Sequence, residues 1–215
     1  MSLIASVLHL DRAAIKALRV TDPYSLHRVV YSLYPDIRSD ADKTSGTSSG
    51  ILYADIGGDF RGRRILMLSN RMPAEQVDDQ YGQVHSKPIA ETFIQQRDYA
   101  FAVVVNPTRR DSASGKLKPI KGREAIAAWF SERAASSWGF TVHPESLQVL
   151  NTDVQQFKDK AQRLVTLAQA HVKGQLCVTD SEKFSQSFSQ GIGRGRTFGC
   201  GLLQLVPINS TTNQF

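Results

Sequence analysis

The order of strand-like and helix-like segments along the 215 residues is the feature that most constrains the fold of this chain. In the first half, apolar and β-branched side chains recur with the two-residue period of strands in four segments. These expected strands are 3–10, 51–58, 63–70 and 99–105, the middle two joined by a hairpin-type turn. A helix is expected from Pro23 to about Tyr34, with Asp22 as its N-cap, and a short helix near 74–81. The first half therefore has the order βαββ(α)β.

The second half repeats this order. Ile126 and Phe130 lie one helical turn apart and predict a helix over 122–135, and Asp180 caps a further helix that Gly191 ends. The expected strands are 139–151, 162–178 and 202–206. Two consecutive units close to βαββαβ predict an α+β protein of two tandem ferredoxin-like (RRM-like) domains. We expect an N-terminal domain over residues 1–106, a C-terminal domain over 107–208, and a tail over 209–215.

Composition narrows the classes of function. The net charge is +6 and the isoelectric point is near 9.4, which favours polyanionic partners. Cys177 and Cys200 are too few for a disulfide framework, and no apolar run suits a secretion signal or a membrane anchor, so a cytoplasmic protein is expected. The five histidines match no HxxxH or HExxH pattern. We therefore expect no metal site and no other cofactor.

A glycine-rich segment at 191–201 is the densest signal in the chain. It holds five glycines (Gly191, Gly193, Gly195, Gly199 and Gly201) and two arginines (Arg194 and Arg196). Alternating glycines can turn consecutive N–H groups toward an anion, and arginines supply charge for phosphate. A tight connection between a helix and a strand would use glycines equally well, and both interpretations remain open. The segment follows a helix and precedes a strand, which is opposite to a dinucleotide-binding fold.

The segment GIGRGRTFGCGLLQL resembles the C-terminal signature of the CasE-type CRISPR repeat-processing endoribonucleases. Tyr24-Ser-Leu-His27-Arg28 is similar to the Y-x-x-H helix of that family, and a strand that ends at Asn106-Pro107 before a basic loop fits its middle part. The strand before Asn106 lacks an arginine that the family pattern has near its end.

The resemblance implies a metal-independent endoribonuclease that binds the repeat hairpin of a precursor CRISPR RNA and cuts at its base. It also implies that the protein stays on its product as a subunit of a Cascade-type complex. His27 is the implied acid/base group, Tyr24 assists or positions, and the glycine-rich segment and Arg28 are implied RNA contacts.

RNA cleavage without a metal requires proton transfer from the 2′-hydroxyl and to the departing 5′-oxygen. Histidine suits both transfers because its unperturbed pKa of about 6.5 lies near working pH. The products would be a 2′,3′-cyclic phosphate, or a 3′-phosphate, and a 5′-hydroxyl. Tyr24, His27, Tyr31 and Tyr34 share one face of the expected helix. For Tyr31 and Tyr34 we expect packing.

Residues 107–123 form a basic segment with a single acid, Asp111. Its cations are Arg109, Arg110, Lys116, Lys118, Lys121 and Arg123. On a flexible loop they are expected to grip the phosphates of an RNA stem, which proteins recognise mainly by backbone and shape. A loop that only keeps the protein soluble remains an alternative.

Two other hypotheses stay open. One is a non-catalytic subunit that binds the RNA hairpin on the same fold, with His27 incidental. The other is an α+β enzyme or ligand-binding domain whose glycines form a pocket for a small anion.

Overall fold

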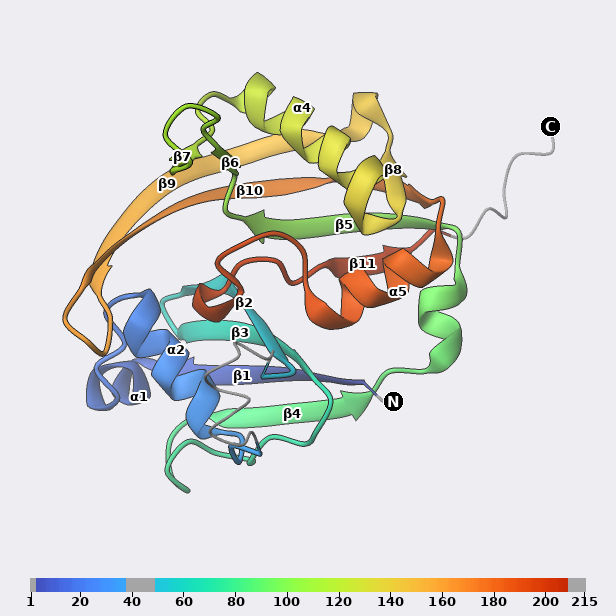
Figure 1. The fold of residues 1–215 in the computed structure, drawn as a ribbon. Coiled ribbons are helices and arrows are strands. Elements are labelled where there is room, and N and C mark those ends of the chain that lie inside the picture. Colours follow the sequence, from blue (N-terminus) through green and yellow to red (C-terminus); the bar gives the residue numbers. More distant parts are fainter. Residues whose placement is uncertain (1–2, 38–48, 209–215) are drawn as a thin grey trace.

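The first sheet is antiparallel and has the strand order β2-β3-β1-β4 (Figure 1). Its strands are β1 (Ile4–Asp11), β2 (Ile51–Asp59), β3 (Gly62–Ser69) and β4 (Gln83–Pro88). This order is that of a ferredoxin-like βαββαβ unit, in which the first and third strands lie in the middle. The computed structural model describes residues 3–37 and 49–208, so the expected tail at 209–215 lies outside the described residues.

Two helices pack on one face of this sheet, α1 (Arg12–Ala17) and α2 (Pro23–Ser32). Asp22 begins α2 as expected: its carboxylate accepts from the N–H of Ser25 at 2.7 Å, and the Ser25 hydroxyl accepts from the N–H of Asp22 at 2.9 Å. Leu26 and Val30 bury the inner face of α2 against the sheet. The short helix α1 follows directly from β1 and was not expected from the sequence.

The second sheet has the order β11-β5-β10-β8, with β9 also paired to β10. Its strands are β5 (Asp98–Val105), β8 (Phe140–Val142), β9 (Gln148–Lys158), β10 (Leu164–Val178) and β11 (Gln204–Pro207). The helices α4 (Arg123–Arg133), which continues as a π-helix to Trp138, and α5 (Ser181–Gln190) pack on one face. This sheet also has the ferredoxin-like order, so the predicted fold class is confirmed.

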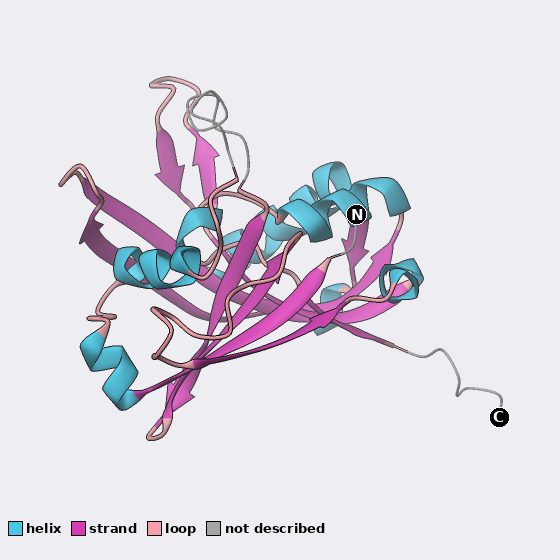
Figure 2. Ribbon diagram, turned by 90° about the horizontal axis from the view of Figure 1, so that it is seen from below, coloured by secondary structure: helices cyan, strands magenta, loops and turns pink. Residues whose placement is uncertain are grey.

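The largest core cluster joins the two units. It lies between the second sheet and the helices α4 and α5, and it extends to Leu52, Ala54 and Leu68 of the first sheet. The segment after α5 therefore lies between the two sheets, as Figure 1 shows. Figure 2 gives the view from below, with strands crossing the middle of the molecule and helices around them. No helix in the described ranges 3–37 and 49–208 is long and apolar enough to span a membrane.

The pairing of β5 differs from the expectation. We expected residues 99–105 to close the first unit, but β5 pairs with β10 and β11 in the second sheet. The fourth strand of the first sheet is β4 instead. We therefore propose that the two units divide between Pro88 and Asp98, ahead of the expected division after residue 106.

Two further expectations were wrong. No helix forms at 74–81, because Asp78 and Asp79 both adopt left-handed backbone conformations (φ 51° and 57°), which end a right-handed helix. The expected strand at 139–151 is broken into β8 and β9 by a 3-10 turn over Pro144–Ser146. Proline has no N–H for the strand ladder.

Candidate active site

His27 lies half-buried on α2, and its ring is held by a backbone carbonyl from the other end of the chain. Its Nδ1 lies 3.0 Å from the carbonyl oxygen of Thr197. A carbonyl oxygen can only accept, so Nδ1 carries the proton in this hydrogen bond. The lone pair of the neutral imidazole is then on Nε2. In this tautomer Nε2 is the nitrogen of His27 that can accept a proton.

Three aromatic rings surround His27. The centroids of the Tyr24 and Phe198 rings lie 6.2 and 6.0 Å from that of His27, and the Tyr31 ring lies at 4.1 Å. The Tyr31 hydroxyl is 2.9 Å from the Ser49 hydroxyl. Tyr31 also packs against the core beneath α2, as expected, and so braces His27 from the core side. Tyr34 is buried in the same core, again as expected.

The Thr197 carbonyl is itself held in place. The hydroxyl of Tyr53, a residue of β2 that is only 1% exposed, donates to this oxygen at 3.0 Å. Burial is the main cause that raises the pKa of Tyr53 well above its usual value, so the hydroxyl keeps its proton and stays a donor. His27 and Tyr53 therefore share one acceptor, which joins α2, β2 and the glycine-rich segment.

The glycine-rich segment builds a tight loop rather than an open row of donors. Several of its N–H groups bond within the protein: those of Phe198 and Cys200 donate to the Gly195 carbonyl at 2.8 and 3.2 Å. The N–H of Gly201 donates to Val104 of β5 at 2.7 Å. Gly199 has φ +83°, and a Cβ there would lie 3.1 Å from the Tyr53 ring. The tight connection thus describes this part, and its contribution to the site is the Thr197 carbonyl.

The remaining residues of the glycine-rich segment have different surroundings. A Cβ added at Gly193 would have no atom within 4 Å, and Arg194 is exposed beside a bridge to Asn106. Arg196 is exposed and donates to the Gln190 carbonyl at 2.9 Å. Gly191 packs against the side chain of Leu52.

A cavity of about 530 Å³ lies beside His27 and brings in residues that the sequence analysis missed. Tyr24, Thr197 and Phe198 line one side, and the turn between β9 and β10 lines the other with Asp159, Lys160, Ala161 and Arg163. The paired strands β9 and β10 reach past the second sheet toward α2 (Figure 1). The signal in the sequence was DKAQR, a basic turn between two long strands, which we did not connect with His27.

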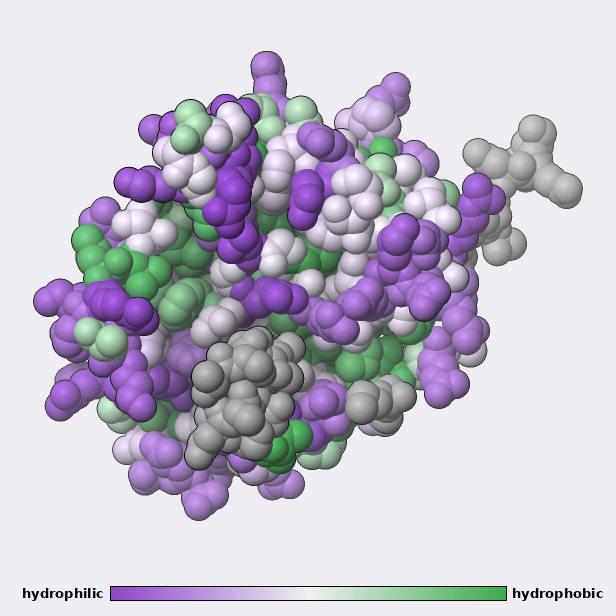
Figure 3. Space-filling view, in the orientation of Figure 1, coloured by the Kyte–Doolittle hydropathy of each residue, from purple (hydrophilic) through white to green (hydrophobic). Residues whose placement is uncertain are grey.

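The basic segment is structured, contrary to the expected flexible loop. The strands β6 (Thr108–Arg110) and β7 (Leu117–Pro119) pair as a hairpin outside both sheets. The Lys118 ammonium lies 2.6 Å from Asp111 and is the largest cause that lowers the pKa of Asp111, to about 2. Hydrophilic side chains gather over this upper part of the molecule in Figure 3.

The structure does not bring this hairpin to the His27 cavity. None of the predicted cations on 107–123 lines that cavity. Arg109, Lys116 and Lys121 are exposed, whereas Arg110 donates to the Gly115 carbonyl and Arg123 to the Leu150 carbonyl. Arg28 is exposed on α2, next to His27 in the chain. Among residues 3–37 and 49–208, no three His, Cys, Asp or Glu side chains are grouped so that they could hold a metal ion.

The orders of the two sheets define a tandem ferredoxin-like protein. It has a candidate acid-base site, where the C-terminal segment holds a histidine of the first unit beside a cavity that cations also line. The chain belongs to the family of CRISPR associated proteins, whose family model matches residues 3–207.

Individual relatives agree with this assignment. The CRISPR-associated endoribonuclease Cse3 of Thermus thermophilus is 28% identical over 141 residues. That alignment covers 61% of this chain and 66% of Cse3, just under two thirds of its length. The structure of Thermus thermophilus Cse3 bound to an RNA representing a pre-cleavage complex superposes with a TM-score of 0.78 at 22% identity, covering 96% of this chain and all of Cse3. A chain of a CRISPR RNA-guided surveillance complex matches with a TM-score of 0.66 at 18% identity, covering 95% of this chain and all of that one.

Proposed function

We propose that the protein is an endoribonuclease that recognises the repeat hairpin in precursor CRISPR RNA and cleaves it at its base. The observation that carries the proposal is the tautomer of His27 at a cavity lined by the exposed Lys160 and by Arg163, which forms an ion pair with Asp159. An imidazole with one defined basic nitrogen suits proton transfer, and the cation of Lys160 suits a phosphate. Family membership and the likeness to Cse3 support this reaction class.

The proposed reaction needs no group beyond the RNA and side chains. The 2′-oxygen loses its proton and attacks the adjacent phosphorus, the bond from phosphorus to the 5′-oxygen breaks, and that oxygen gains a proton. The products are a 2′,3′-cyclic phosphate, or the 3′-phosphate after its hydrolysis, and a 5′-hydroxyl. Neutral His27 can take the first proton, and protonated His27 can supply the second. Tyr24, stacked against His27, positions the ring or the substrate.

This chemistry predicts cleavage that survives metal removal and depends on one oxygen atom. In the presence of EDTA, the protein should cut hairpin RNA from the host repeat as fast as it does without EDTA. A single 2′-deoxy nucleotide at the cut should abolish cleavage, because the nucleophile is gone. Product end groups are read by mass spectrometry and by phosphatase sensitivity. Loss of cutting in EDTA that added Mg²⁺ restores, or cutting of the 2′-deoxy RNA, would contradict the mechanism.

We further propose that the β6–β7 hairpin and the exposed arginines Arg28, Arg194 and Arg196 bind the RNA backbone. The exposure of Arg28 and Arg194 supports this role, because mobile cations at the surface can follow phosphates, whereas Arg196 donates to the Gln190 carbonyl. Lys118 is paired with Asp111, and Arg110 and Arg123 are bonded to carbonyls, so the exposed Arg109, Lys116 and Lys121 are the strongest candidates on the hairpin.

Replacing Arg109, Lys116 and Lys121 together with alanine should weaken RNA binding and its dependence on salt. Each lost phosphate contact should lower the slope of log K against log salt by about 0.7 to 0.9. Fluorescence anisotropy from low to moderate salt measures both quantities. The matched control replaces Lys87, Arg133 and Lys183, which removes the same charge elsewhere. Equal slopes for the two variants would assign the effect to net charge and not to the hairpin.

The partners follow from the same proposal. The protein would remain on its cleaved hairpin as a subunit of a Cascade-type complex, which the match to a chain of a surveillance complex supports. Cys177 and Cys200 are both free thiols, which suits the reducing cytoplasm where we place the protein. The non-catalytic RNA-binding subunit would bind the hairpin without cutting it. The small-anion pocket loses support over residues 198–201, whose N–H groups bond internally.

A further inference from the structure

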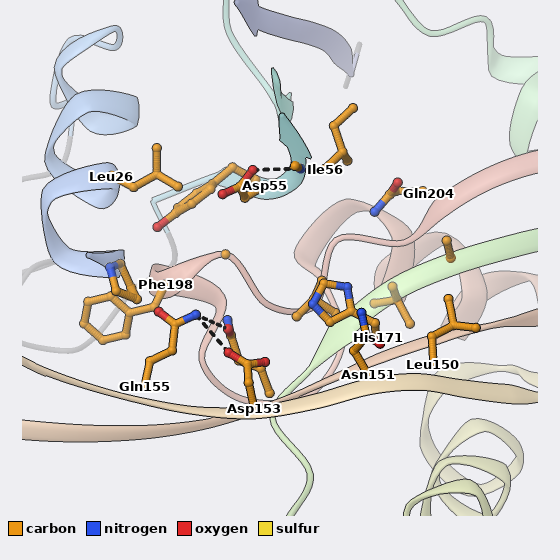
Figure 4. Close-up of a pocket in the computed structure, with 18 of the residues that line it drawn as sticks. Leu26, Asp55, Ile56, Leu150, Asn151, Asp153, Gln155, His171, Phe198 and Gln204 are labelled. Carbon is orange, nitrogen blue, oxygen red and sulfur yellow. Dashed lines mark hydrogen bonds between the residues drawn. The ribbon is translucent and has the colours of Figure 1, made fainter. Parts of the chain in front are cut away.

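A second and larger cavity separates the two sheets. It has a volume of about 710 Å³, and we call it the intersheet cleft. In Figure 4 the side chains of β9 and β10 point across the cleft toward Leu26, Asp55 and Ile56 of the first unit. The cleft lies on the face of the second sheet that the helices α4 and α5 leave uncovered.

The second-sheet wall of this cleft is rich in amides. It carries the side chains of Asn151, Gln155, Gln169, His171, Lys173 and Gln204. A carboxamide offers both a donor and an acceptor, and so does a neutral imidazole. Nucleobase edges present the same two functions, and proteins read unpaired RNA through such contacts.

The charges of the cleft argue for bases rather than phosphates as the groups bound. Arg63 of β3 forms an ion pair with Asp55 of the neighbouring β2, and Lys173 of β10 is the other cation that lines the cleft. Asp153 accepts from the Gln155 amide at 3.0 Å. Asp22 also lines the cleft, so its three carboxylates (Asp22, Asp55 and Asp153) outnumber its two cations (Arg63 and Lys173). A channel that gripped phosphates would carry an excess of cations.

The intersheet cleft and the His27 cavity share a lining residue. Phe198 lines both the intersheet cleft and the His27 cavity. Its ring centroid lies 6.0 Å from that of His27 and 4.8 Å from that of Phe157, against which it packs edge to face. An RNA strand that passes His27 would therefore meet the Phe198 ring before it reaches the amide side chains of the second sheet. Aromatic rings stack on any base.

We propose that the intersheet cleft binds unpaired nucleotides that flank the hairpin on one side of the scissile phosphate, and reads their bases through His171 and Gln204. This inference rests on the proposed function, since it assigns a further part of the same substrate. By reading the unpaired flank, the cleft would let the protein distinguish its repeat RNA from another RNA hairpin that has the same stem. A partner polypeptide is the competing occupant, because its backbone also carries donors and acceptors.

The test compares three RNAs and three proteins. One RNA is a minimal hairpin with a single nucleotide beyond the cut, and the other two carry unpaired repeat nucleotides on the 5′ side and on the 3′ side. All three are made with a 2′-deoxy nucleotide at the cut for binding and without it for cleavage. The proteins are the wild type, His171→Ala/Gln204→Ala, and the control His143→Ala/Gln186→Ala, which removes the same two residue types at exposed positions outside the cleft.

One flank should tighten binding by about tenfold in the wild type and the control, and abasic nucleotides in that flank should remove the gain. The His171→Ala/Gln204→Ala protein should lose the gain while it cuts the minimal hairpin at the wild-type rate. That retained activity shows an intact fold. No gain from either flank in the wild type, or a gain that survives the double substitution, overturns the inference and favours a polypeptide occupant. Failure of the wild type to cut the minimal hairpin would instead count against the proposed function.

Discussion

Replacing His27 with alanine should lower the single-turnover rate of RNA cleavage by about 10² to 10⁴-fold, the usual contribution of a general acid or base. The dissociation constant for the hairpin should change little, because most of the proposed RNA contacts are made by cations elsewhere. The rate is measured with enzyme in excess over labelled repeat RNA, and binding with the 2′-deoxy RNA. The separation of the two effects is what identifies His27 as an acid/base group.

A matched control sharpens this result. His143→Ala removes an exposed histidine that lines neither the His27 cavity nor the intersheet cleft, and it should leave both quantities unchanged. Wild-type cleavage by His27→Ala would contradict the catalytic role. Hairpin binding by the unaltered protein with no cleavage at all would favour the non-catalytic RNA-binding subunit.

Replacing Gly201 with alanine should destabilise the protein by about 2–4 kcal/mol, the range of large effects from backbone strain and clashes. The residue has φ +85°, and a Cβ there would lie 2.3 Å from the backbone oxygen of Ile192, which cannot move like a side chain. Gly201 also bonds to Val104 and Ile192, so a shift of the loop would carry the Thr197 carbonyl away from His27. Cleavage should therefore fall with stability. Denaturant unfolding measures the first effect and single-turnover kinetics the second.

Gly193→Ala is the matched control within the same loop. Gly193 also has a positive φ, +69°, but nothing lies within 4 Å of the position of an added Cβ. Its substitution should cost only the conformational penalty of about 1–2 kcal/mol. Equal losses for the two variants would show that the close contact at Gly201 has no energetic weight.

The local signals in the sequence predicted most elements because they depend on nearby residues. Asp22 and Asp180 each accept a hydrogen bond from the N–H three residues on, so their helices begin where expected. The helix expected at 74–81 failed for the same kind of reason, since Asp78 and Asp79 reverse the backbone locally. A rule based on periodicity does not register such a reversal.

The local signals did not predict which strands pair when they lie far apart in the sequence. The alternation in β5 marks a strand, but it does not say that Phe101 lies opposite Gly174 and Leu205 and not in the first sheet. Partner choice depends on which apolar faces close over one core, and that core is assembled from both halves of the chain. The reach of the turn at Lys160 toward His27 depends equally on the path of two long strands.

The sequence by itself determined the α+β class and the starts of the main helices, which are properties of side-chain type and short spacing. It indicated His27 only through the resemblance of Tyr24-Ser-Leu-His27-Arg28 to the Y-x-x-H helix of the family. Only the tertiary structure decided which atom holds His27. That atom is the backbone carbonyl oxygen of Thr197, 170 positions away in the chain, and the sequence cannot single it out because every residue has a backbone carbonyl. The intersheet cleft likewise exists only once two sheets face each other, since its walls come from segments that share no local pattern.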